Sequence, residues 1–216
     1  MYVLSMRSWC IIITVIICIL IVYLRVTYNP FKNKNVVIVG NSKELLQQEL
    51  GHVIDSHDIV IRLNNYRLDG YEKYTGTKTD GVHMNYYTIP PSRIHGILKN
   101  NRIQWMGTRN KLSFCWNAKL NPFDNRIFQY DPKVLPCRSP TSGTAALADI
   151  LKYCNRPVSI IGLDGYTEPG YYYKESDEVV SYNTSNANIR HCPQKEKLFI
   201  ENLIKEGKVR KLTSQV

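Results

Sequence analysis

Residues 36 to 65 read VVIVGNSKELLQQELGHVIDSHDIVIRLNN and predict a strand, a turn, a helix and a second strand. Residues 36–39 are all β-branched, which is typical of a strand buried on both faces. Gly40 permits a tight turn, and Ser42 can cap the helix that follows, in which leucines recur at helical spacing. Residues 58–63 return as the second strand. The stretch therefore predicts the first unit of a parallel α/β sheet.

Asn41 and Asn64 follow the two strands, so we expect both at the carboxyl edge of the sheet, where open α/β sheets bind ligands. The pieces GNS and IDSHDIVIRLN, whose two asparagines are 23 positions apart, resemble the large sialylmotif of glycosyltransferase family 29, the eukaryotic-type sialyltransferases. The resemblance implies an α/β, Rossmann-like fold with a mainly parallel sheet flanked by helices. It also implies that Asn41, Ser42 and Asn64 bind a cytidine monophosphate (CMP) sugar donor.

A second informative stretch, residues 139–165, reads SPTSGTAALADILKYCNRPVSIIGLDG. Its Thr-Ser-Gly turn at residues 141–143 opens an amphipathic helix, and such a turn offers free N–H groups and hydroxyls to an anion. The stretch resembles the small sialylmotif, which holds the CMP part of the donor. It also resembles the bacterial sialyltransferases of family 42, which use the same donor on a related fold. The residues that these resemblances assign to donor binding here are Thr141, Ser142, Gly143, Gly162 and Asp164.

Two shorter motifs follow. Tyr171-Tyr172-Tyr173-Lys174 imperfectly matches an aromatic motif of the family, which implies that Tyr172 donates a hydrogen bond to the leaving phosphate. Three tyrosines equally describe a partly buried loop. His191, followed five positions later by Glu196, resembles the family's very small motif. His191 is then the general base, with Glu196 supporting it or capping the last helix.

Between the motifs the sequence is less informative. Residues 76–79, GTKT, resemble a family segment that leads into a strand, here residues 82–86, and to the edge of the donor pocket. Residues 94–98 suit a short helix and residues 103–106 a strand. Residues 107–138 show no clear period. In the family the corresponding region helps to form the acceptor site, so the acceptor cannot be predicted.

The N-terminus contains 16 uncharged and mostly apolar residues, 9–24, which we interpret as a transmembrane signal anchor. A cleaved signal peptide is the alternative, but no small-x-small cleavage site follows. This interpretation gives a short tail at residues 1–8, a short stem at 25–34 and a catalytic domain at 35–216. The family resemblance implies a type II orientation, with the domain in the Golgi lumen or otherwise outside the cytoplasm.

The six cysteines follow no metal-ligand spacing, and the sequence does not determine how they pair. Family 29 enzymes usually join the two sialylmotifs by a disulfide. Cys154 matches one partner of that bridge, but Val36 occupies the position of the other. Asn183 begins a glycosylation acceptor pattern, which equally arises by chance in an Asn-rich chain.

The net charge of +10 is compatible with nucleic acid, a membrane surface or an anionic substrate. No nucleic-acid-binding motif occurs, so we expect no nucleic-acid partner. The motifs predict inverting transfer of sialic acid from CMP-sialic acid to a glycan hydroxyl on a glycoprotein or glycolipid. Because no Asp-x-Asp sequence occurs, we expect neither a metal nor another cofactor. The alternatives are transfer of another CMP-activated acid sugar, such as Kdo, and a catalytically silent, membrane-tethered nucleotide-sugar-binding protein.

Overall fold

A computed structural model describes the chain at residues 6–27, 29–84, 89–100, 102–124, 126–129, 135–137, 139–163, 171–173 and 191–213. The chain divides into two compact units, residues 1–30 and 31–216. The first contains helix α1 (Met6–Thr27). Within the described part of the chain, no helix combines the length and apolarity that a membrane crossing requires. The span predicted at residues 9–24 is therefore not confirmed.

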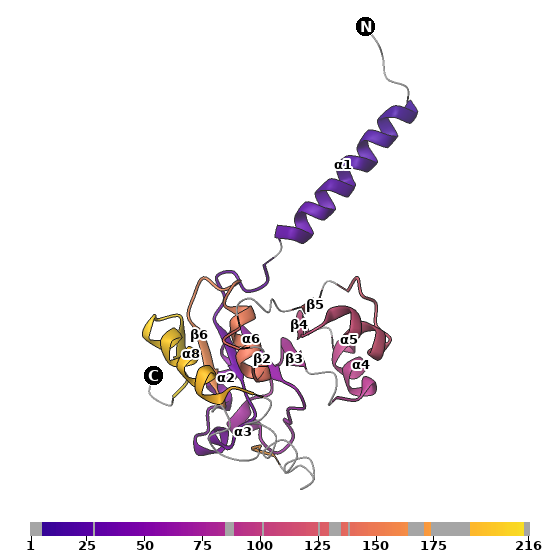
Figure 1. Cartoon of the computed structure of the whole chain (residues 1–216). Helices are drawn as coiled ribbons and strands as arrows, with labels where there is room; N and C mark the ends of the chain where they lie inside the picture. The colour runs from indigo at the N-terminus through magenta and orange to yellow at the C-terminus, as the bar shows by residue number, and fades with distance from the viewer. Residues whose placement is uncertain are drawn as a thin grey trace. The chain divides into compact units, whose positions relative to one another are not determined.

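The second unit is built on a seven-stranded sheet in which every described pairing is parallel (Figure 1). The strand order β5-β4-β3-β2-β1-β6-β7 confirms the predicted α/β fold with a parallel sheet. The strands are β1 (Val36–Val39), β2 (Ile59–Leu63), β3 (Gly81–Met84), β4 (Trp105–Thr108), β5 (Ile127–Gln129), β6 (Val158–Ile161) and β7 (Val209–Lys211).

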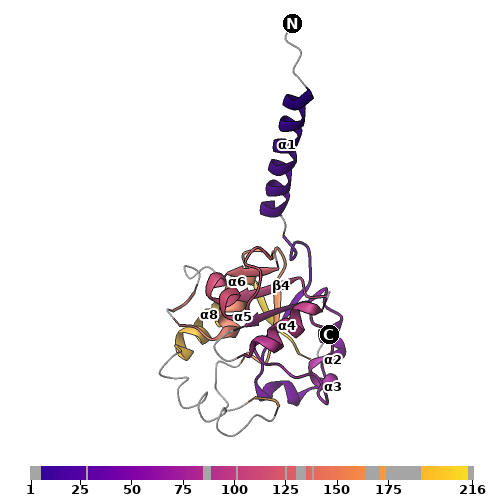
Figure 2. The same ribbon diagram turned by 90° about the vertical axis from the view of Figure 1, so that its right-hand side faces the viewer.

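Helices cover both faces of the sheet. Figure 2 shows α6 and α8 to one side and α2 and α3 to the other. Alternate residues of β1 serve the two faces, because Ile38 packs in the cluster that includes Leu147 of α6 and Val37 packs with Ile54 of α2. The helical segments of this unit are η1 (Lys43–Gln47), α2 (Gly51–Asp55), α3 (Glu72–Thr75), α4 (Pro91–Lys99), α5 (Lys111–Ala118), α6 (Ser142–Ile150) and α8 (Pro193–Lys205).

The structure differs from the sequence prediction in four places. The helix expected after Ser42 is two short pieces, η1 and α2, because Gln48 between them is extended, with φ −143° and ψ 139°. Strand β4 begins two residues later than predicted. Helix α5 and strand β5 occupy the stretch without clear period, and β7 was not predicted.

Candidate functional site

The strand order reverses at β1, which pairs with β2 on one side and with β6 on the other. Such a reversal opens a crevice at the carboxyl edge of a parallel sheet. Here the loops after β1 and β6 lie in contact, since Ser42 N–H donates to the Gly162 carbonyl at 3.2 Å. A Cβ at Gly40 would lie 1.9 Å from that same oxygen, so only glycine allows this approach.

Asn41 and Asn64 meet at this crevice, as the sequence predicted. The Asn41 amide donates to the Leu63 carbonyl at 3.1 Å, directly before Asn64. Asn41 is 9% exposed, and its Oδ1 has no hydrogen-bond partner in the described part of the chain. Asn64 has a positive φ of 48°, a conformation that asparagine tolerates better than most residues. A buried acceptor and a turn residue thus stand side by side at the sheet edge.

The start of α6 contacts the segment that carries Leu63 and Asn64. Thr141 caps the helix, accepting from Thr144 N–H through its hydroxyl at 3.3 Å. The Ser142 hydroxyl donates to Asn64 Oδ1 at 3.4 Å. A Cβ at Gly143 would lie 3.2 Å from a methyl of Leu63, so the helix start approaches β2 closely. Three distant segments therefore converge at this edge of the sheet, and their role in binding a donor stays a prediction.

Gly162 ends β6 with a positive φ of 68°, which favours glycine, and its carbonyl holds the β1 loop. Its contribution is thus to the shape of the crevice. Asp164 lies outside the described residues.

Tyr172 sits next to the site, but its hydroxyl is already engaged. It accepts from Arg67 N–H at 2.8 Å and donates to the Arg67 carbonyl. The side chain is 4% exposed, and burial raises the pKa of its phenol. Its main-chain N–H donates to the Asn41 carbonyl at 3.0 Å. This geometry favours the buried-loop interpretation of the tyrosines, in which Tyr172 fastens two loops around the crevice.

His191 lies directly before Cys192, the N-cap residue of α8. Its Nδ1 is 2.9 Å from the Ser139 carbonyl. Because a carbonyl only accepts, Nδ1 must carry a proton, and in the neutral ring Nε2 is then the basic nitrogen. Ser139 precedes the Thr141 turn by two residues, so the same segment orients His191 and leads into the start of α6.

Glu196 is 1% exposed and links α8 to α6. Its carboxylate accepts from Thr141 N–H at 2.9 Å and from the Thr141 hydroxyl at 2.6 Å. Its other oxygen accepts from Cys192 N–H at 3.4 Å. Glu196 therefore supports both the histidine-bearing segment and the predicted donor turn.

A disulfide joins Cys137 to Cys192, with a Cα–Cα distance of 6.7 Å. Cys154, the residue matching the usual family bridge, is a free thiol whose pKa burial raises to about 12. Cys137, Cys192 and Glu196 are the one group in the described residues spaced to hold a metal ion. The two sulfurs are bonded to each other, however, so neither is a thiolate ligand.

Sequence reasoning missed this bridge and the role of Ser139. The available signal was Cys192 beside His191, paired with a second cysteine just before the small motif. A backbone carbonyl such as that of Ser139 leaves no trace in side-chain patterns.

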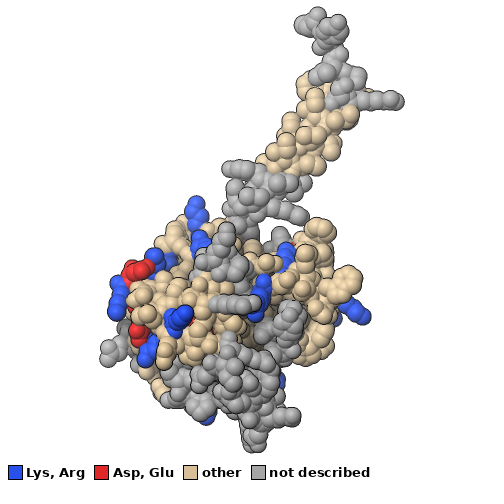
Figure 3. All heavy atoms as spheres, viewed as in Figure 1, with Lys and Arg blue, Asp and Glu red and all other residues tan. Residues whose placement is uncertain are grey.

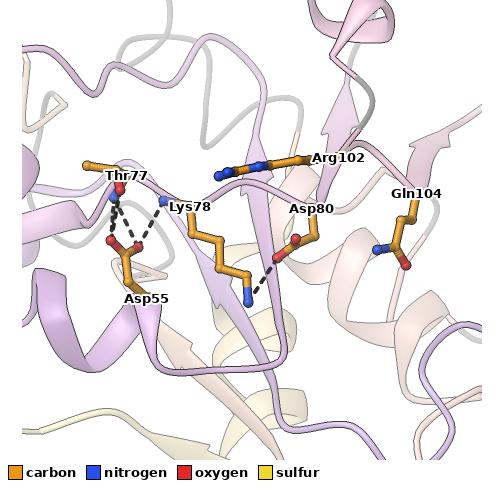
Figure 4. Close-up of a pocket in the computed structure, with 6 residues that line it drawn as sticks. All are labelled: Asp55, Thr77, Lys78, Asp80, Arg102 and Gln104. Carbon is orange, nitrogen blue, oxygen red and sulfur yellow. Dashed lines mark hydrogen bonds and ion pairs between the residues drawn. The ribbon is translucent and has the colours of Figure 1, made fainter.

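The opposite edge of the sheet carries a cavity of about 400 Å³ (Figure 4). Asp80 and Gln104, which line it, directly precede β3 and β4. Lys78 belongs to the GTKT run and donates there to the His57 and Asp58 carbonyls. That run therefore lies at the amino edge, so its expected place beside the donor pocket was wrong. The six lining residues are Asp55, Thr77, Lys78, Asp80, Arg102 and Gln104.

Comparison with known proteins gives a consistent result. A family model for glycosyltransferase family 29 (sialyltransferase) matches residues 24–116. A type 2 lactosamine alpha-2,3-sialyltransferase of Pan troglodytes is 26% identical over 231 residues, covering 86% of this chain and 67% of that protein.

Two solved structures share the fold. The crystal structure of a mammalian sialyltransferase has a TM-score of 0.61 at 18% identity, covering 83% of this chain and 68% of that one. The sialyltransferase CST-II, solved with a trisaccharide acceptor and CMP, has a TM-score of 0.57 at 17% identity, covering 84% and 82%. The chain is therefore similar in sequence to a named alpha-2,3-sialyltransferase and, over residues 24–116, to glycosyltransferase family 29, and it shares its fold with solved sialyltransferases.

Proposed function

We propose that this protein transfers sialic acid from CMP-sialic acid to a hydroxyl of a glycan acceptor, with inversion and without a metal ion. The observation that carries the proposal is the meeting of Asn41, Asn64 and the Thr141 turn at the strand-order reversal. These three segments are the ones that resemble the large and small sialylmotifs. The named relatives and the shared fold support the same chemistry.

The donor would lie across the crevice with its phosphate at the start of α6. The N–H groups of the first helical turn point outward there, and the helix dipole favours negative charge. Asn41 Oδ1, buried and without a partner in the described part of the chain, is suited to accept from an N–H or O–H of the nucleoside. Neutral donors at this position would stabilise the charge that develops as CMP departs.

His191 would serve as the base. Its Nε2 takes the proton of the acceptor hydroxyl while the oxygen attacks the anomeric carbon. The bond between that carbon and the phosphate oxygen breaks, and CMP leaves with the electron pair. Attack from the face opposite CMP inverts the anomeric centre. The Ser139 carbonyl fixes the ring so that Nε2, rather than Nδ1, carries out this step.

A donor and acceptor screen on the purified full chain tests the proposal. We expect CMP release from CMP-sialic acid that depends on a galactose-terminated acceptor and continues in a chelator. Release from CMP-Kdo alone would identify the other acid sugar. Tight CMP binding without turnover of either donor would indicate the silent binding protein. Activity lost in chelator and restored by manganese or magnesium would contradict the metal-free mechanism.

Membrane attachment and a location in the Golgi lumen stay predictions from the sequence. The lumenal location requires that a protease added outside sealed microsomes leaves the domain intact. It is also supported if Asn183, in its acceptor pattern, carries a glycan. Cleavage of the domain in sealed microsomes would contradict the lumenal location.

A further inference from the structure

The cavity at the amino edge of the sheet is a second concave site, at the edge opposite the candidate crevice. Its volume of about 400 Å³ lies within the usual range for small-molecule sites, about 300–1,000 Å³. Asp80 and Gln104 stand directly before β3 and β4, and the two strands are already joined there, since Gln104 N–H donates to the Asp80 carbonyl at 2.7 Å. The ends of two paired strands therefore hold two of the lining side chains in place.

Some of the lining groups are already engaged within the protein. The Asp55 carboxylate accepts from the main-chain N–H groups of Thr77 and Lys78, each at 2.9 Å, and from the Thr77 hydroxyl at 3.0 Å. The Lys78 ammonium donates to two main-chain carbonyls at 2.6 and 2.9 Å and lies 3.7 Å from an oxygen of Asp80. These groups shape the wall of the cavity, and little of their hydrogen-bonding capacity remains for a ligand.

Three other lining side chains keep polar atoms to offer. Asp80 is 7% exposed; its Oδ2 accepts from Val60 N–H at 2.8 Å, while its Oδ1 has no hydrogen-bond partner in the described part of the chain. The side chains of Arg102 and Gln104 are exposed and make no hydrogen bond or ion pair with any described residue. Figure 4 shows the Asp80 carboxylate between Lys78 and Gln104, with Arg102 extending above it. A carboxylate oxygen, a guanidinium and a carboxamide thus line one cavity.

The chemistry of this lining disfavours several classes of ligand. All six lining residues are polar, so an apolar ligand would gain no apolar burial, and none offers an aromatic ring on which a nucleoside base could stack. The described residues that are spaced to hold a metal ion lie elsewhere. Two carboxylates and two cations balance, so the lining has no net charge to attract an anion. The basic side chains on the face drawn in Figure 3 are scattered, so the chain's +10 charge marks no anion site there either.

We propose that this cavity binds a neutral sugar residue of a glycan. Adjacent hydroxyls of a pyranose ring each donate one hydrogen bond and accept others, which matches a carboxylate that accepts, a guanidinium that donates and a carboxamide that does both. Asp80 Oδ1 would accept from one hydroxyl, and Arg102 and Gln104 would bind the oxygens beside it. The proposal does not depend on the transferase activity, because the cavity shares no residue with the crevice at the carboxyl edge.

Titration of the full chain with neutral oligosaccharides that end in galactose, mannose or N-acetylglucosamine tests the proposal. The chain is kept in a detergent without a sugar headgroup, because a glycoside detergent would compete for the site. Hydrogen exchange then locates the bound sugar: we expect protection of residues 77–80 and 102–104, whereas an acceptor in the crevice would protect residues 40–42 and 141–144. A glycoprotein that carries the same glycan should compete with the free oligosaccharide if the natural ligand is attached to a protein.

Two variants remove the proposed contacts. Arg102→Ala with Gln104→Ala should weaken sugar binding by more than about tenfold, because several hydrogen bonds are lost, and it should fold because both side chains are exposed. Asp80→Asn keeps an oxygen that accepts from Val60 N–H but removes the charge, and should weaken binding by about tenfold.

The matched control is Arg156→Ala, which removes an exposed arginine two residues before β6, at the same edge of the sheet but outside the lining. It should bind sugar like the wild type. Wild-type affinity of the double variant, protection at the crevice alone, or no binding of any of the oligosaccharides would overturn the proposal. So would protection of residues 77–80 and 102–104 by inorganic phosphate but not by a sugar, which would identify an anion site instead.

Discussion

Glu196 at the start of α8 accepts two hydrogen bonds from Thr141 at the start of α6, one from the main-chain N–H at 2.9 Å and one from the hydroxyl at 2.6 Å. The same carboxylate accepts from Cys192 N–H, next to His191. One buried side chain therefore couples the segment that carries the proposed base to the turn that would hold the donor.

We expect Glu196→Ala to lower the free energy of unfolding by about 1–3 kcal/mol, because Thr141 N–H loses a buried charged acceptor. CMP affinity should fall as well, since the turn is no longer held. Glu196→Gln keeps an acceptor oxygen and should recover much of both losses. Thermal unfolding and CMP titration measure the two effects. Glu201→Ala, an exposed glutamate on the same helix, serves as the control. Wild-type behaviour of Glu196→Ala in both measurements would rule out the coupling.

Replacing His191 by Ala should reduce transfer by about 10²–10⁴-fold, the usual loss for a positioned base. CMP binding should stay near the wild-type value, because the groups at the crevice remain. Transfer kinetics and calorimetric titration separate the two. His52→Ala is the matched control, since His52 is an exposed histidine on α2 and is separated in sequence from His191. If His191→Ala transfers normally, or fails to fold, the assignment of the base is wrong.

The parts of the site that depend on local sequence pattern could be predicted from the sequence. The β-branched run at β1 and the GNS turn predicted a parallel edge, and β1 begins and ends where expected. Contacts between residues that are far apart in the sequence could not be predicted. Tyr172 is engaged by Arg67, which is 105 positions away, and Cys137 pairs with Cys192 across 55 positions. Helix α5 was missed because it buries residues on one face and exposes Leu112 and Trp116 on the other, which blurs its period.

Tyr172→Phe distinguishes the two interpretations of the tyrosine loop. If the hydroxyl fastens Arg67, its loss should lower the free energy of unfolding by about 1 kcal/mol and leave the transfer rate within a few fold. If it instead binds the leaving phosphate, kcat should fall with unchanged stability. Urea unfolding and kcat are measured together, with Tyr74→Phe as the control. A change in kcat alone would contradict the structural role.

The Cys137–Cys192 bridge should contribute up to about 4 kcal/mol to stability, from the loop entropy of a separation of 55 residues. Cys137→Ser, or reduction of the wild type, should therefore lower the unfolding midpoint. Cys154→Ser should not, because Cys154 is a free thiol. Unfolding in the presence and absence of reductant measures this. A midpoint that is insensitive to reductant while Cys154→Ser lowers it would mean that the pairing is different.

Stability should fall as the solution is acidified, and His83 supplies part of the effect. The ring is fully buried on β3, and burial lowers its pKa from 6.5 to about 4. Between these values the unfolded chain binds a proton that the folded chain excludes, so the free energy of unfolding decreases as pH falls below 6.5 and has lost roughly 3 kcal/mol near pH 4. His57, whose pKa burial also lowers, acts in the same direction. His83→Gln removes only the first contribution, so the gap in unfolding free energy between wild type and variant should shift by about that amount between pH 7 and pH 4. Urea-unfolding series across this range measure the gap, and a gap that does not change with pH would show that His83 is not neutral in the folded protein.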